Sequence, residues 1–223
     1  MPTGGRKILP KAEMEAGLSR SEPSNLMRII PTEENMRNTK LITMIEGAII
    51  AGVCVALSFI PLNTANASFD LSLGLIPLGI FALKRGALPA MAVGFVWGLL
   101  LIVLGKAYIL MIPQVLLEYP VAFAFGGLGG ILAPVLLREL SADRMGAAIR
   151  TIVFSGLISA AARWFFHFLA GLIFWGDFAP EGMSPVAFSL FFNGISAAAN
   201  ALMLAIILPI LFRATRPLFA DKG

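Results

Sequence analysis

The chain has 223 residues, of which 58% are hydrophobic and 13% are charged, with a net charge of +4 and a mean hydropathy of +0.86. This composition is typical of a helical membrane protein and excludes an ordinary soluble core. The length allows six spans with short loops and leaves no room for a separate catalytic domain. The single cysteine, Cys54, lies in an apolar stretch, so we expect it to serve in packing.

The N-terminal region differs in composition from the rest of the chain. Residues 1–40 are polar, contain four prolines and carry charges of both signs. They lack the apolar stretch of a secretory signal, and we interpret them as a largely disordered cytoplasmic extension. Thr32 is the expected cap of a short helix that leads into the first span. Residues 41–212 then form the membrane domain, and 213–223 form a cytoplasmic tail.

The apolar runs predict an all-α membrane protein with six transmembrane helices. The expected spans are residues 41–61, 70–83, 87–104, 113–137, 147–175 and 185–212. Crossing the hydrocarbon takes about 20 residues, so the short second span requires tilt, local thinning of the bilayer or burial among its neighbours.

The distribution of positive charge predicts the orientation of these spans. If the spans alternate in direction, 15 of the 17 Lys and Arg residues fall on the same side as both termini. Lys106 lies in a loop on the other side, and Arg163 lies inside a span. The positive-inside rule therefore places both termini in the cytoplasm.

Three polar side chains interrupt the apolar, aromatic-rich spans: Glu118, His167 and Asn193. A charge at membrane depth costs roughly 2.5–3.5 kcal/mol on insertion scales, so it usually faces a cavity or a partner. In the predicted orientation, all three lie about 7–12 Å from the outer ends of their helices. Their similar depth predicts a shared pocket that opens to the outside.

Aromatic residues adjoin these three positions in the sequence: Tyr108, Tyr119, Trp175 and Phe188. A carboxylate surrounded by rings suits a flat organic cation, because each ring adds about 0.5–2 kcal/mol of cation–π attraction to the charge pairing. An amide and an imidazole can add directional hydrogen bonds.

Each of these residues also has a purely structural interpretation. Glu118 could pair with Arg163, either as a purely structural ion pair or in addition to binding a ligand. His167 and Asn193 could form interhelical hydrogen bonds, and Trp175 could belong to the aromatic belt at the membrane interface. One histidine and one cysteine do not predict a metal site, and the sequence has no phosphate-binding loop motif.

Small residues mark a second candidate surface. Ala48, Gly52 and Ala56 recur at i, i+4 and i+8, which leaves a smooth stripe where another helix can approach closely. The stripe serves either a partner subunit or internal packing. Residues 126–130 form a similar close-approach site.

Several motifs resemble the thiamine-specific S component of energy-coupling-factor (ECF) transporters. They are Ala107–Leu110, Gln114 with Leu117–Tyr119, Phe165–Phe168 with Gly171 and Trp175, and Ser189 with Asn193–Ser196. The resemblance covers about residues 41–212, with the motifs in order and at the expected spacing.

This resemblance implies a six-helix, multi-pass subunit of the cell membrane that captures thiamine from outside, without a cofactor and without enzymatic activity. It implies ATP-driven uptake by partners, namely a transmembrane coupling subunit that docks on Ala48, Gly52 and Ala56, and two ATPase subunits. The implied thiamine site comprises Glu118, His167, Trp175, Asn193, Tyr108 and Tyr119. Phe188 stands where the family has a tyrosine, and Phe69 lies where its first outer loop carries a tryptophan.

Two other functions remain as alternatives. One is an S component or solitary carrier for a related small aromatic such as a hydroxymethylpyrimidine, which Phe188 and the missing tryptophan favour. The other is a membrane enzyme that uses Glu118 and His167 as an acid–base pair. The absence of an apparent nucleophile or metal set argues against the enzyme.

Overall fold

The computed structural model describes residues 33–60, 62 and 69–215. The secondary-structure elements within these ranges are helices and helical turns. The chain divides into two compact units, 1–41 and 42–223, and the contacts described below lie within the second. The predicted Thr32 cap, most of the 1–40 extension and most of the stretch around residue 66 fall outside the described residues.

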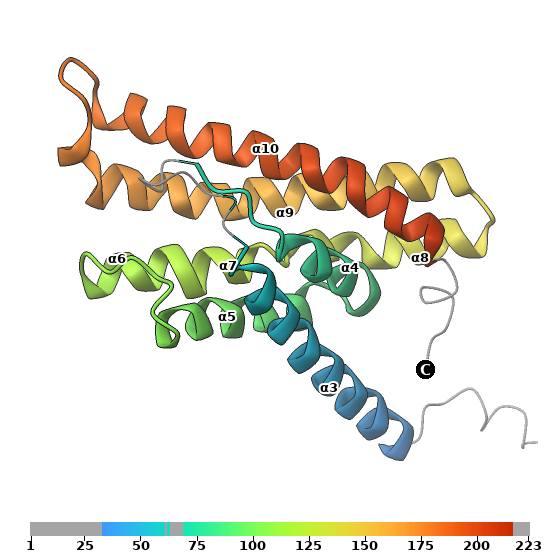
Figure 1. Cartoon of the computed structure of the whole chain (residues 1–223). Helices are drawn as coiled ribbons and strands as arrows, with labels where there is room; N and C mark the ends of the chain where they lie inside the picture. The colour runs from blue at the N-terminus through green and yellow to red at the C-terminus, as the bar shows by residue number, and fades with distance from the viewer. Residues whose placement is uncertain (1–32, 61, 63–68, 216–223) are drawn as a thin grey trace, which may run out of the picture. The chain divides into compact units, whose positions relative to one another are not determined.

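In the described part of the chain, five helices have 11 residues or more (Figure 1). They are α3 (Glu33–Leu57), α4 (Leu75–Arg85), α5 (Ala87–Val103), α9 (Met145–Phe174) and α10 (Pro185–Ala214). The last two pack against each other along their length and adjoin the 3₁₀ turn Gly176–Phe178. The side-chain hydroxyl of Ser184 caps α10 by accepting a hydrogen bond from the Ala187 amide at 3.2 Å.

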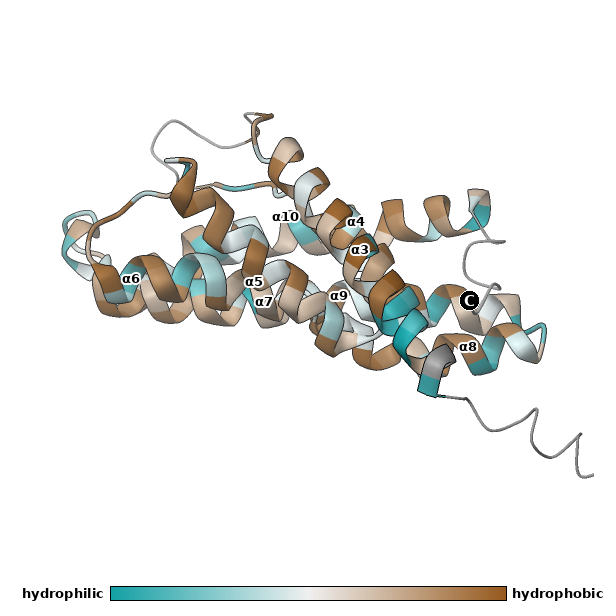
Figure 2. Cartoon of the chain, turned by 90° about the horizontal axis from the view of Figure 1, so that it is seen from below, coloured by the Kyte–Doolittle hydropathy of each residue, from teal (hydrophilic) through white to brown (hydrophobic). Residues whose placement is uncertain are grey.

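Four stretches are long and apolar enough to cross a membrane: Met36–Leu57, Ile112–Ser141, Met145–Phe174 and Pro185–Ala214. Hydrophobic residues dominate much of these helices, as Figure 2 shows. Helix α5 is apolar but has only 17 residues. The prediction of membrane-spanning helices is confirmed for the four long stretches.

The predicted second span is wrong at its start, because α4 begins at Leu75 rather than near residue 70. The amide of Asp70 donates to Ser196 Oγ at 3.1 Å, and the amide of Ser72 donates to Asn200 Oδ1 at 2.9 Å. These amides therefore bond to side chains of α10 instead of forming a helical turn.

The fourth predicted span is a chain of short helices rather than one regular helix. Its parts are α6 (Ile112–Leu116), the π turn η1 (Leu117–Val121), α7 (Ala122–Phe125), the 3₁₀ turn η2 (Leu128–Leu132) and α8 (Ala133–Ser141). Pro120 lies inside the π turn and has no N–H to donate to the preceding turn. Such wide turns recur at functional sites.

The predicted close approach at residues 126–130 is confirmed as internal packing. Ser155 on α9 donates its hydroxyl to the Gly129 carbonyl at 3.0 Å, and the Gly129 amide donates to Ser159 Oγ at 3.2 Å. A Cβ at Gly130 would lie 2.6 Å from the Gly86 carbonyl carbon, so only glycine allows this approach. The irregular stretch Leu128–Leu132 therefore packs closely against both α5 and α9.

Candidate functional site

Glu118 lies on the π turn and accepts hydrogen bonds from two neutral donors. One carboxylate oxygen accepts from the Gln114 side-chain amide. The other accepts from the Trp175 indole N–H at 2.6 Å. Glu118 takes part in no ion pair among the described residues. Its carboxylate is therefore held in place while its negative charge is left without a counter-ion.

Gln114 connects this carboxylate to the loop between α5 and α6. Its side chain is fully buried; it accepts from the Leu110 amide at 2.9 Å and donates to the Tyr108 carbonyl at 3.2 Å. The Tyr108 amide donates to the Tyr119 hydroxyl at 2.9 Å, and the Tyr108 ring centroid lies 5.3 Å from that of Trp175. The structure thus brings together four of the predicted site residues, namely Tyr108, Glu118, Tyr119 and Trp175.

His167 lies on α9, and Trp175 directly follows the end of this helix. Gly171 lies four residues from each of them, so the three positions follow one face of the helix. The His167 ring centroid is 6.3 Å from that of Phe123, whose ring in turn stacks at 5.7 Å on Tyr119. His167 Nε2 is buried and has no hydrogen-bond partner among the described residues. A buried unpaired ring nitrogen is uncommon, and a ligand group would satisfy it.

Asn193 packs against the same face of α9 from the neighbouring helix α10. A Cβ placed on Gly171 would lie 2.8 Å from Asn193 Nδ2, so a glycine at this position lets the amide approach. The amide donates to Ser189 Oγ at 3.2 Å, and Ser189 donates to the Phe168 carbonyl at 2.8 Å. One amide donor of Asn193 is therefore used within α10, and it is Ser189 that forms the hydrogen bond to α9. An interhelical hydrogen bond of Asn193 itself stays a prediction.

The other two predicted site residues are Phe188 and Phe69. The Phe188 ring packs at 5.0 Å on Phe192 of the same helix. Phe69 is half-buried and immediately precedes Asp70. Their contact with a ligand stays a prediction.

Arg163 pairs with Asp70, so the alternative that it pairs with Glu118 is wrong in this structure. Its Nη2 lies 3.2 Å from Asp70 Oδ2, and its Cζ lies 4.4 Å from the Phe123 ring centroid. The guanidinium is buried, whereas the Asp70 side chain is 46% exposed.

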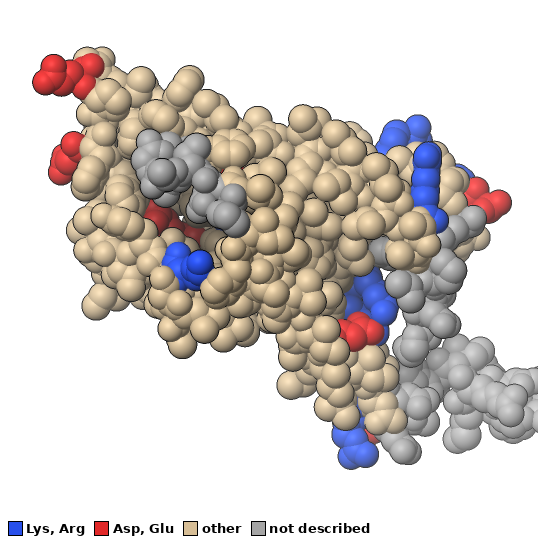
Figure 3. Space-filling view, in the orientation of Figure 1, with Lys and Arg blue, Asp and Glu red and all other residues tan. Residues whose placement is uncertain are grey.

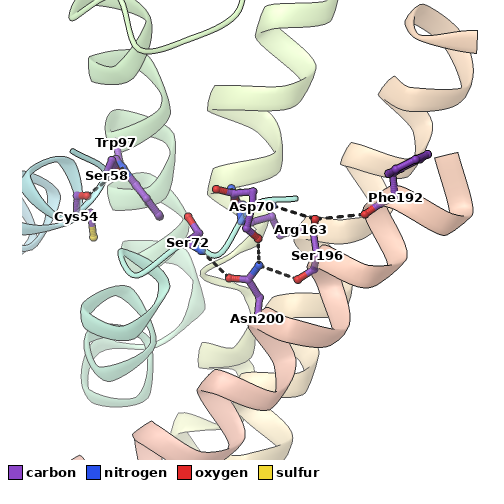
Figure 4. Close-up of polar contacts among 9 residues, drawn as sticks. All are labelled: Cys54, Ser58, Asp70, Ser72, Trp97, Arg163, Phe192, Ser196 and Asn200. Atoms are coloured by element: carbon purple, nitrogen blue, oxygen red, sulfur yellow. Dashed lines mark hydrogen bonds and ion pairs between the residues drawn. The ribbon is translucent and has the colours of Figure 1, made fainter. Parts of the chain in front are cut away.

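The hydrogen bonds of Ser196 and Asn200 to the Asp70 backbone were not predicted from the sequence (Figure 4). Asn200 is buried and donates to the Asp70 carbonyl at 2.8 Å, while Ser196 accepts from the Asp70 amide. A signal was visible, because polar residues recur at helical spacing along one face of α10. They are Ser189, Asn193, Ser196 and Asn200.

The stripe of small residues on α3 is exposed. The opposite side of the helix is buried through Ala51 and Cys54, and the Cys54 thiol donates to the Gly74 carbonyl at 3.2 Å. Ala48, Gly52 and Ala56 are exposed, and a Cβ on Gly52 would meet no atom within 4 Å. Packing among the described residues therefore does not explain the stripe.

Glu46 is a second acid in an apolar helix, and the sequence reasoning did not single it out. Its carboxylate accepts from Arg85 Nε at 2.7 Å and from Lys84 Nζ at 3.0 Å. This ion cluster ties α3 to the end of α4.

Lys and Arg side chains gather toward one end of the membrane domain. Figure 3 shows Lys and Arg atoms, with some acidic atoms beside them, around the end of α10 and the start of α9, and acidic atoms at the turn between α9 and α10. The cytoplasmic placement of both termini stays a prediction.

Comparisons with known proteins agree on one family. The model of the thiamine transporter protein family (Thia_YuaJ) matches residues 44–220. The thiamine transporter ThiT of Lacticaseibacillus paracasei is 34% identical over 189 residues, which are 83% of this chain and 94% of the relative. ThiT of Bacillus subtilis is 28% identical over 190 residues, 84% and 99% of the two chains. The solved structure of ThiT from Listeria monocytogenes has a TM-score of 0.77 at 39% identity and covers 81% of this chain and 98% of its own.

Proposed function

This chain belongs to the thiamine transporter protein family, and we propose that it is the thiamine-binding subunit of an ECF-type transporter. It is a multi-pass protein of the cell membrane. In this proposal it captures thiamine on the outer side, and partner subunits drive uptake with ATP. Thiamine joins a positively charged thiazolium ring to an aminopyrimidine, so its site needs a negative charge, flat apolar walls and a hydrogen-bonding edge.

The hydrogen bonding of Glu118 is the observation that carries this proposal. Its oxygens accept from Gln114 and Trp175, both neutral, and no cation among the described residues pairs with it. The Trp175 indole that donates to this carboxylate packs at 5.3 Å against the Tyr108 ring. This arrangement supports a site that supplies charge pairing and ring stacking to an organic cation.

We assign the aminopyrimidine to His167 and Asn193. Among the described residues, His167 Nε2 has no partner and offers one hydrogen-bonding position, and the hydrogen bond of the Asn193 side chain to Ser189 uses one of its N–H groups. Both residues lie against the α9 face that ends at Trp175. Tyr119 supports the same wall through its stack on Phe123, and Phe188 and Phe69 are assigned to the rim.

We assign the exposed stripe Ala48, Gly52 and Ala56 to docking of the transmembrane coupling subunit, which connects to two ATPases. The exposure of all three residues and the open space at Gly52 support this assignment. The proposal includes α4 and α5 as two short spans, which makes six, with both termini in the cytoplasm as the positive charges indicate.

Titration of the purified protein with thiamine, followed by tryptophan fluorescence, tests the proposal. We expect saturable quenching because Trp175 contacts the ligand-binding carboxylate, and a Trp175→Phe variant should lose most of that signal. Thiamine should be recovered unchanged, which separates a binding protein from an enzyme. A flat trace with thiamine overturns the proposal, and tighter binding of a hydroxymethylpyrimidine would favour the alternative ligand.

A further inference from the structure

A buried positive charge lies close to the site to which we assign a positively charged ligand. Arg163 is 6% exposed and precedes His167 on α9 by four residues, about one helical turn. Its Cζ lies 4.4 Å from the Phe123 ring centroid, and that ring stacks on Tyr119 and lies 6.3 Å from the His167 ring. Without a counter-ion this guanidinium would repel a cationic ligand and attract Glu118.

Asp70 supplies that counter-ion from a segment outside the bundle helices. Its carboxylate pairs with Arg163 Nη2 at 3.2 Å. Its backbone is held from both sides, because the Asp70 amide donates to Ser196 and its carbonyl accepts from Asn200 (Figure 4). The backbone bonds place the carboxylate at the guanidinium without relying on the ion pair itself.

We propose that Asp70 is a specificity-determining residue that acts through Arg163, and this inference rests on the proposed function. Asp70 cancels the guanidinium charge and keeps Arg163 from neutralising Glu118. With Asp70 present, the three groups sum to one negative charge, which a cation can balance. Without Asp70 they sum to zero, and Arg163 competes with the ligand for Glu118.

A purely structural role for Asp70 makes a different prediction. If Asp70 only anchors the segment that leads into α4, its loss weakens binding of every ligand to a similar extent. If it acts through charge, its loss weakens binding of cations and spares neutral molecules of the same shape. The two roles are therefore separated by a pair of ligands that differ only in charge.

The experiment compares thiamine with an analogue whose thiazolium is replaced by an uncharged ring of the same size. For Asp70→Asn in the full chain, we expect thiamine affinity to fall on the order of tenfold, as for an uncompensated unit charge about 10 Å away. The affinity for the neutral analogue should change by less than about threefold. Asp70→Glu, which keeps the charge, should retain the wild-type preference for the cation.

Two further variants complete the test. Ser196→Ala removes a hydrogen bond to the Asp70 backbone but keeps all charges, so any effect should be equal for both ligands. Asp70→Asn combined with Arg163→Gln removes both charges and should recover most of the thiamine affinity lost in Asp70→Asn. It also tests the inference if Asp70→Asn alone does not fold.

Equal weakening of both ligands in Asp70→Asn, or no weakening of either, would overturn this inference. A double variant that binds thiamine no better than Asp70→Asn would also overturn it. If Asp70→Asn does not fold, the inference is overturned by a double variant whose affinity falls more for thiamine than for the neutral analogue. A wild-type protein that fails to bind thiamine would instead overturn the proposed function, so the two failures are distinguishable.

Discussion

Glu118 and Glu46 both lie in apolar helices of this protein, and their partners are opposite in kind. Glu118 accepts hydrogen bonds from an amide and an indole, both neutral. Glu46 accepts from Arg85 and Lys84, so its charge is already balanced. The difference teaches that an acid at membrane depth is not by itself a ligand site, because an ion pair inside the protein explains it equally well.

The backbone around the two acids also differs. Glu118 lies in a π turn that contains Pro120, next to the loop that Gln114 holds. Glu46 lies in the regular helix α3, whose small residues face outward. In the irregular region, side chains converge around the Glu118 carboxylate, whereas the regular region presents a smooth exposed stripe of small residues.

The largest effect is expected from Glu118→Gln, which keeps the shape of the side chain and removes its charge. Thiamine binding should weaken by about 2–5 kcal/mol, because a thiazolium then loses its counter-charge in a desolvated site. Isothermal titration calorimetry of the purified protein measures this loss. Near wild-type affinity in the variant would show that charge pairing with Glu118 does not drive binding.

Gly52→Leu should separate binding from uptake. The new side chain meets no atom within 4 Å at its Cβ, so the fold and thiamine binding should be unchanged. Thiamine uptake in vesicles that contain the coupling subunit and ATPases should fall by more than about tenfold, because the leucine fills the smooth stripe.

Val53→Leu is the matched control, since Val53 is also exposed on α3 but lies beside the stripe. It should leave uptake intact. Full uptake by Gly52→Leu would mean that the partner docks elsewhere.

Glu46→Gln should affect stability and leave binding alone. The substitution leaves Arg85, whose side chain is only 13% exposed, without its counter-ion. We expect a loss of about 1–2 kcal/mol in unfolding free energy, between the values for exposed and buried ion pairs. Thermal unfolding in detergent measures it. A thiamine affinity lowered as much as in Glu118→Gln would erase the contrast between the two acids.

The sequence predicted the long helices well and the interruptions poorly. Helices α9 and α10 follow from two uninterrupted apolar stretches, and both were placed within about two residues of their observed ends. Asp70 was assigned to a helix, because nothing local to it shows that its amide bonds to Ser196, 126 residues away. Contacts of this kind depend on the register between helices, which a single sequence does not contain.

In the candidate site, too, single residues were predictable from the sequence and their long-range contacts were not. Glu118 stands out in the sequence because a carboxylate in an apolar helix is costly, and Pro120 was a visible signal for the turn that carries it. The bond of Glu118 to Trp175 and the pairing of Arg163 with Asp70 join residues 57 and 93 positions apart, and neither pairing was predicted. Sequence reasoning thus selected residues that the structure brings together around Glu118, but not the hydrogen bonds and the ion pair that join them.

The smallest effect is expected from Phe188→Tyr, which sharpens the description of the ligand site. The resemblance places a tyrosine here, and Phe188 is half-buried one turn before Phe192, on the helix that carries Asn193. A new hydroxyl that reaches the ligand should add about 0.5–1.5 kcal/mol, a twofold to tenfold gain in thiamine affinity. Phe191→Tyr, at an exposed position of the same helix, should give no gain. Equal titration curves for both variants and the wild type would place Phe188 outside the ligand's reach, and the affinity would then depend on the Glu118 side of the site alone.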